Sequence, residues 1–194
     1  LILDQTSITH GGGVGSDSLV MRVARSGVEW VRKPICNLND RAWSVDVDSA
    51  GNVFVAGELF GNNSAWHYIT WGSIQLGVRG WQTSYFVKFS NVGAIGWALG
   101  TDIDTNSNYY VKNPSVDIEG SHLLVSANYN RAFRFYSASY SSHWHSTHIN
   151  GHPNSVVVEL TNTGSVKSSS AWFCSGWSTI FDVAWIDIQN NYDH

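Results

Sequence analysis

Three histidines lie close together in the chain, at a spacing that suits a transition-metal site. If they lie on a strand, His143 and His145 point to the same face, because side chains two residues apart share a face of a sheet. With His148 as a third ligand, the set suits Zn²⁺ or Cu²⁺. No Cys, Asp or Glu stands nearby to complete the set, so an exposed polar strand is the alternative interpretation.

A second group of side chains offers oxygen atoms, which a harder cation prefers. Asp102, Asp104 and Asn106 occupy alternate positions, as at the start of a Ca²⁺-binding loop. The pattern then departs from that loop, because Ser107 stands where glycine is needed and Asn113 where glutamate is needed. The alternative is a turn between strands, which Asp and Asn favour. Calcium and zinc are therefore the two possible cofactors.

The chain holds ten tryptophans, a residue type that suits sugar binding as well as a packed core. An exposed indole can stack on a sugar ring while neighbouring polar groups bond the sugar hydroxyls. The candidate ligand-binding rings lie in or beside long segments between predicted strands, and they are Trp66, Trp71, Trp81 and Trp144. The alternative is that these rings pack one structural unit against the next. Four others lie in predicted strands and are expected in the core: Trp30, Trp43, Trp97 and Trp185.

The sequence contains no recognisable catalytic motif. It has no nucleophile elbow, no zinc-protease motif and no phosphate-binding glycine loop followed by a helix. No catalytic residue is therefore assigned, and a non-enzymatic role is the main expectation.

A repeat of about 71 residues must position these candidate residues. The string Ser-Val-Asp-Val at 44–47 reappears as Ser-Val-Asp-Ile at 115–118, and Gly93 reappears as Gly164 at the same offset. A third copy begins near Asp187. A β-rich period of this kind indicates stacked units that bury a shared core.

Each complete unit is predicted to contain four strands. Alternating or apolar runs separated by Gly, Asp and Asn turns place the strands of the middle unit at 43–47, 53–57, 85–89 and 95–98. The next unit repeats them at 115–119, 122–127, 155–160 and about 165–173, and an earlier partial unit has strands at 19–23 and 28–31. Four antiparallel strands are typical of a propeller blade, so the predicted fold is all-β. The predicted divisions are a partial blade at 1–40, full blades at 41–111 and 112–178, and the first strand of a further blade at 179–194.

Residues 45–57 resemble the signature of the bacterial SBBP-type β-propeller repeats. That signature has an Asp, a Gly-Asn turn, and a strand of β-branched and aromatic residues that ends in Gly. Residues 71–76, 85–89 and 93–97 are similar to the second half of the repeat, and the resemblance covers most of residues 16–188. It implies a propeller fold and an extracellular or surface location, and it implies no particular activity.

The number of units leaves three arrangements open. A closed propeller needs at least four blades, and four units of this length would take about 284 residues, against the 194 of this chain. The chain could be part of a longer propeller, could complete a ring or fibre with other copies, or could form an open stack. An open blade edge favours pairing with another chain.

Composition favours a secreted or cell-surface protein. Charged residues make up 13% of the chain, about half of what is usual in soluble domains. The net charge of −4 argues against a nucleic-acid partner, and no apolar run is long enough to span a membrane. The start at Leu1 is compatible with a removed signal peptide. Cys36 and Cys174 are expected as buried thiols or in a disulfide.

Together these features predict a propeller module for binding or assembly outside the cell. Its expected partners are other protein chains, copies of itself or glycans. One alternative is a purely structural subunit of a ring, filament or appendage, and another is a propeller-based hydrolase or lyase. In the best-preserved unit, six strand residues are expected in the core: Val45, Val47, Val53, Val55, Phe86 and Phe89.

Overall fold

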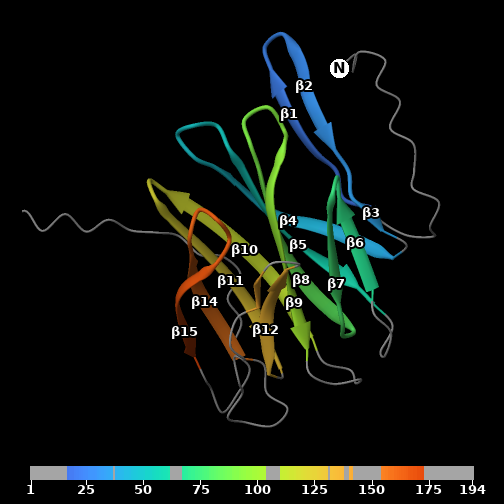
Figure 1. Cartoon of the computed structure of the whole chain (residues 1–194), viewed down its shortest axis with the longest axis vertical. Helices are drawn as coiled ribbons and strands as arrows, with labels where there is room; N and C mark the ends of the chain where they lie inside the picture. Colours follow the sequence, from blue (N-terminus) through green and yellow to red (C-terminus); the bar gives the residue numbers. More distant parts are fainter. Residues whose placement is uncertain are drawn as a thin grey trace, which may run out of the picture.

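The computed structural model shows an all-β protein built from antiparallel sheets (Figure 1). The structure describes residues 17–36, 38–61, 67–103, 110–130, 132–137, 140–141 and 154–172. These residues form fifteen strands and no helix. The described part of the chain therefore contains no helix of the length and apolar character that crossing a membrane requires.

Four neighbouring strands form the centre of the molecule, and we call them the first set. Their order in the sheet is β4-β5-β8-β9, with every neighbouring pair antiparallel. Their bounds are β4 Asn39–Val47, β5 Val53–Phe60, β8 Gln82–Phe89 and β9 Ile95–Ile103. The β4–β5 turn forms locally, because Asp48 Oδ1 accepts hydrogen bonds from the N–H groups of Ala50 and Asn52 at 3.0 and 2.8 Å, while Gly51 takes a φ of +79°.

A second set of four strands has the same order, β10-β11-β14-β15. The bounds are β10 Val111–Glu119, β11 His122–Tyr129, β14 Asn154–Leu160 and β15 Val166–Trp172. The first pair of strands shows a pairing irregularity at the corresponding place in each set, at Ala42/Ser44 and at Lys112/Ser115. The strands predicted for both units are confirmed, and several are longer than predicted.

The N-terminal part of the described chain is a two-stranded hairpin at the top of Figure 1. Its strands are β1 Val20–Ala24 and β2 Gly27–Arg32. Five further strands were not predicted: β3 Ile35–Cys36, β6 His67–Trp71, β7 Ile74–Val78, β12 Phe133–Ser137 and β13 Tyr140–Ser141. β6 pairs with β3 and β7 in a separate sheet, whereas β12 and β13 extend the first set beyond β9.

Two apolar cores lie on opposite sides of the first set. Phe54 and Phe86 belong to the core shared with the second set, whereas Val55 and Val87 belong to the core shared with the β1–β2 hairpin and the β3-β6-β7 sheet. Adjacent residues of a strand point to opposite faces, so β5 and β8 serve both cores.

The predicted core of the middle unit is confirmed for Val53, Val55, Phe86 and Phe89, which are all buried. The prediction is wrong for Val45 and Val47, which are 62% and 51% exposed. Trp43 was also expected in the core and is 54% exposed. All three lie on β4, the last strand of its sheet. The β1–β2 hairpin buries residues of β5 and β8 on this face but leaves β4 uncovered.

Candidate functional site

A surface groove runs between β4 and the residues that lead into β1, and we call it the β4 groove. It consists of two adjoining hollows of about 310 and 280 Å³, both lined by Leu19, Ala42 and Trp43. One hollow adds mostly polar residues, namely Asp17, Ser18, Asp40 and Arg41. The other adds mostly apolar ones, namely Val20, Met21, Ser44, Val45 and Val55.

Asp40 forms a buried polar end of the groove, with only 1% of its surface exposed. Its Oδ1 accepts a hydrogen bond from the backbone N–H of Ser18 at 2.7 Å, and another from the Ser18 hydroxyl. Its Oδ2 has no hydrogen-bond partner among the described residues. Because buried polar atoms are nearly always hydrogen-bonded, an oxygen without a partner is an unusual feature at this end of the groove.

Burial raises the pKa of Asp40 from 3.8 to about 6. The nearby charge of Asp17 acts in the same direction, while the hydrogen bond from Ser18 and the charge of Lys33 oppose it. Asp17 is itself paired with Lys33 at 2.9 Å. The groove therefore contains a carboxyl group that changes its charge close to neutral pH.

Asp40 is linked through the hydroxyl of Ser18 to the hydroxyl of Tyr85. Ser18 Oγ lies 2.9 Å from the hydroxyl of Tyr85, and the carbonyl of Arg41 lies 3.3 Å from the same hydroxyl, which can donate to either oxygen. Burial raises the pKa of Tyr85, so its phenol stays neutral. Gly57 leaves room for this ring, because a Cβ there would lie 2.3 Å from it.

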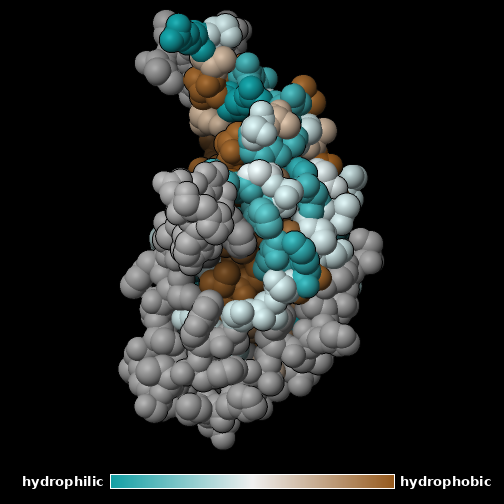
Figure 2. Space-filling view, turned by 90° about the vertical axis from the view of Figure 1, so that its left-hand side faces the viewer, coloured by the Kyte–Doolittle hydropathy of each residue, from teal (hydrophilic) through white to brown (hydrophobic). Residues whose placement is uncertain are grey.

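The other end of the groove is an exposed apolar patch. Trp43, Val45 and Val47 of β4 are exposed, as are Met21 and Val23 of β1. Figure 2 shows apolar side chains at the surface, beside polar ones, in the upper part of the molecule that carries the β1–β2 hairpin. Met21, Trp43 and Val45 line the same hollow, and exposed apolar side chains that gather beside polar ones are typical of an interaction site.

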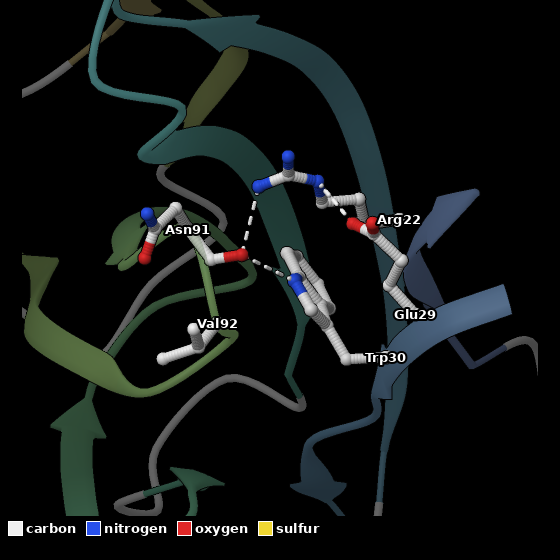
Figure 3. Close-up of a pocket in the computed structure, with 5 residues that line it drawn as sticks. All are labelled: Arg22, Glu29, Trp30, Asn91 and Val92. Carbon is white, nitrogen blue, oxygen red and sulfur yellow. Dashed lines mark hydrogen bonds and ion pairs between the residues drawn. The ribbon is translucent and has the colours of Figure 1, made fainter. Parts of the chain in front are cut away.

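A separate hollow of about 460 Å³ lies between the β1–β2 hairpin and the turn after β8 (Figure 3). Its polar groups already bond one another. Arg22 Nε lies 2.6 Å from Glu29, and the carbonyl of Asn91 accepts from Arg22 Nη1 at 2.8 Å and from Trp30 Nε1 at 3.1 Å. We assign these contacts to the packing of the hairpin on the first set.

Of the tryptophans predicted to bind a ligand, the two that the structure describes do not line the β4 groove. Trp71 is buried and packs edge-on against Phe89, with ring centroids 5.5 Å apart, as the packing alternative describes. Trp81 is 47% exposed but lines neither hollow of the groove. Trp66 and Trp144 lie outside the described residues.

Asp102, the first residue of the predicted calcium loop, lies in β9 and is fully buried. Its carboxylate accepts hydrogen bonds from Arg79 at 3.0 and 3.2 Å and from Arg134 at 3.2 and 3.0 Å. Two guanidinium groups therefore take the place that a cation would occupy.

The other predicted metal ligands lie outside the described residues: Asp104, Asn106, His143, His145 and His148. The zinc set and the rest of the calcium set therefore stay predictions. Within the part of the chain that the structure describes, no group of three or more His, Cys, Asp or Glu side chains could hold a metal ion.

The sequence predictions omitted Asp40 and placed Trp43 in the core, yet the repeat carries a signal for both. At the 71-residue offset, Asp40 is matched by Val111, which is buried, and Trp43 by Pro114. The distinctive side chains of the groove therefore lie at positions where the two units differ in chemistry.

Comparisons of this chain with protein-family models, with curated proteins and with solved structures found no match in any of the three.

Proposed function

We propose that the chain is a binding and assembly module that acts outside the cell. In this proposal its two strand sets are adjacent propeller-type blades, and it associates with other chains of its kind through the β4 groove. The shared four-strand order of the two sets supports the blade assignment. The low content of charged residues, 13%, supports a secreted or surface location.

One comparison within the molecule carries the proposal. Val116 and Ile118 stand 71 positions after Val45 and Val47, and they are only 6% and 8% exposed because they pack in the core shared with the first set. Their counterparts on β4 are more than half exposed. Burying a valine side chain contributes about 1.5–3 kcal/mol, so a partner that covers this face gains substantial free energy.

Sedimentation velocity tests this association. Between about 1 and 100 µM, the mass of the wild-type chain should rise with concentration. A Val45→Glu/Val47→Glu variant should raise the dissociation constant about tenfold or more, because it places charges on the apolar face. Val92→Glu is the matched control, since Val92 is at least as exposed as the two β4 valines but lies outside the groove. A wild-type chain that remains monomeric throughout this range would contradict the proposal.

Glycan binding in the same groove is a second candidate function, favoured by one observation. The exposed ring of Trp43 lines the same hollow as the exposed side chain of Arg41. A sugar ring could stack on the indole while one of its hydroxyls accepts a hydrogen bond from this guanidinium group.

A glycan array followed by titration calorimetry tests the second candidate. Trp43→Ala should abolish binding, whereas Trp81→Ala, the matched exposed tryptophan outside the groove, should leave it unchanged. Binding that is lost in Trp81→Ala but kept in Trp43→Ala would place the site at Trp81. A chain that binds no glycan would contradict this candidate function.

A further inference from the structure

The two sets are joined by hydrogen bonds from side chains of β4 to the backbone of β10. Ser44 and Asp46 extend from β4 to the edge of β10. Ser44 Oγ accepts from the N–H of Val116 and donates to its carbonyl, both at 3.3 Å, and Asp46 Oδ2 accepts from the N–H of Ile118 at 2.7 Å. Phe54 of β5 packs into the same core. The β4–β5 ribbon therefore packs against the second set on the side where β10 is the outermost strand.

The β1–β2 hairpin packs on the first set as β8 and β9 pack on the second. Trp97 of β9 donates from Nε1 to the carbonyl of Asn162 at 2.9 Å, and Trp30 of β2 donates to the carbonyl of Asn91 at 3.1 Å (Figure 3). In both places the indole covers the turn glycine two residues beyond that asparagine, 2.8 Å from where its Cβ would stand.

A serine before each tryptophan strengthens the correspondence. Ser84 of β8 donates from Oγ to the carbonyl of Val111 at 3.0 Å. Ser18, two residues before β1, donates from its N–H to the carboxylate of Asp40, which stands 71 positions before Val111. These matched contacts identify β1 and β2 as the counterparts of β8 and β9.

The surroundings of β1 differ from those of β8 in one respect. β8 pairs with β5 on the side away from β9, whereas among the described strands β1 pairs with β2 alone. The face of β4 beneath this place holds Val45 and Val47, both exposed. The N–H of Val47 is bonded at 2.8 Å by Oδ1 of its own neighbour Asp46, whereas the matching N–H of Ile118 is bonded from the first set.

We infer that a two-stranded antiparallel ribbon of the β4–β5 type, supplied by another chain with the same repeat, adds to the side of β1 away from β2 and covers Val45 and Val47. The first strand of the ribbon carries Ser or Thr and Asp two residues apart, which accept from the N–H groups of these two valines. Its second strand extends the sheet of β1 and turns a large apolar side chain onto the β4 face. The inference rests on the proposed function, because it names the partner of the same groove.

A fluorescein-labelled peptide of residues 39–61 of this chain serves as the probe, titrated with the full chain and followed by anisotropy. Binding should be saturable, at least about tenfold weaker for the Val45→Glu/Val47→Glu chain, and unchanged for the Val92→Glu chain. A peptide with Ser44→Ala and Asp46→Ala should also bind about tenfold more weakly, because it lacks the oxygens that bond the strand edge. Hydrogen exchange should slow at the amides of β1 when the peptide binds.

The outcomes separate this inference from the proposed function. Self-association of the chain without peptide binding overturns the ribbon and leaves the assembly role standing. Peptide binding by a chain that stays monomeric supports the ribbon and contradicts self-association. If the peptide does not bind at about 100 µM, the inference is overturned. The same holds if binding fails because residues 1–16 of the same chain fill the groove. Binding that both peptides show equally also overturns it.

Discussion

Asp40 holds a carboxyl group where the matching position in the second set holds a buried valine. A buried carboxyl with one oxygen that has no hydrogen-bond partner in the described part of the chain destabilises the folded state. The same residue lies beside the exposed Trp43 in the groove. The first set therefore has a destabilising carboxyl group, in place of a buried valine, at the groove where we propose that a partner binds.

Replacing Asp40 should remove one pH dependence from the stability of the chain. Its pKa is about 6 in the folded state, above the ordinary 3.8, so the folded state binds the proton more tightly. The stability that this proton contributes is complete below pH 3.8 and is lost as the pH rises through about 6. From about pH 4 to about pH 7, the free energy of unfolding of Asp40→Asn should therefore improve relative to wild type by about 1–2 kcal/mol.

Urea unfolding of both proteins across this pH range measures the difference, and other titrating groups cancel between them. A difference that stays constant with pH would show that Asp40 has no raised pKa in the folded chain.

The exposure of Val45 and Val47 marks the limit of prediction for single residues. The alternation in residues 43–47 correctly predicts a strand. It cannot predict which side chains are buried, because burial depends on a second sheet that covers β4, and the hairpin that lies nearest covers β5 and β8 instead. The exposure of Trp43 has the same cause.

Among the elements, β5 contributes to both cores, as β8 does, since alternate residues enter one core or the other. Alternating or apolar runs, together with the repeat, predicted this strand and its seven counterparts in the two sets. The β6–β7 hairpin escaped prediction because its segment mixes polar and aromatic residues without a clear period. It is held by pairing with β3, from a distant part of the chain, and β12 is held in the same way by β9.

Two aspartate substitutions on paired strands test this assignment of faces. Val55 and Val45 are direct cross-strand partners, but only Val55 is buried. Val55→Asp should lower the free energy of unfolding by about 3–5 kcal/mol, because it buries an unpaired charge. Val45→Asp should stay within about 0.5 kcal/mol of wild type in dilute solution. Urea unfolding followed by circular dichroism compares them, and equal losses would contradict the exposed position of β4.

On the scale of the whole described molecule, the first set joins two cores into one folding unit. Neither core is complete without β5 and β8. The repeat predicted the order of strands in each set. It did not predict what covers the outermost face, because in the proposed assembly that depends on contacts with other chains, which no pattern within one chain specifies.

This sharing predicts a single cooperative unfolding transition. Phe54→Ala, which removes a buried ring between the two sets, should lower the free energy of unfolding by about 3–5 kcal/mol and shift the whole transition. In differential scanning calorimetry, the calorimetric and van't Hoff enthalpies should agree for both proteins. Two separate transitions, with only one moved by the substitution, would show that the cores unfold independently.

The two matching indole contacts, Trp30 with Asn91 and Trp97 with Asn162, have a consequence for how such a chain changes length. In the first set, the carbonyl of Asn91 accepts from the indole of the β1–β2 hairpin, and the indole of Trp97 donates to the second set. A tandem duplication of residues 41–111 would therefore supply both halves of the new junction in one genetic event, with no compensating mutation. Recombination between copies can add or delete units while every remaining junction stays intact, so chain length is free to vary during evolution.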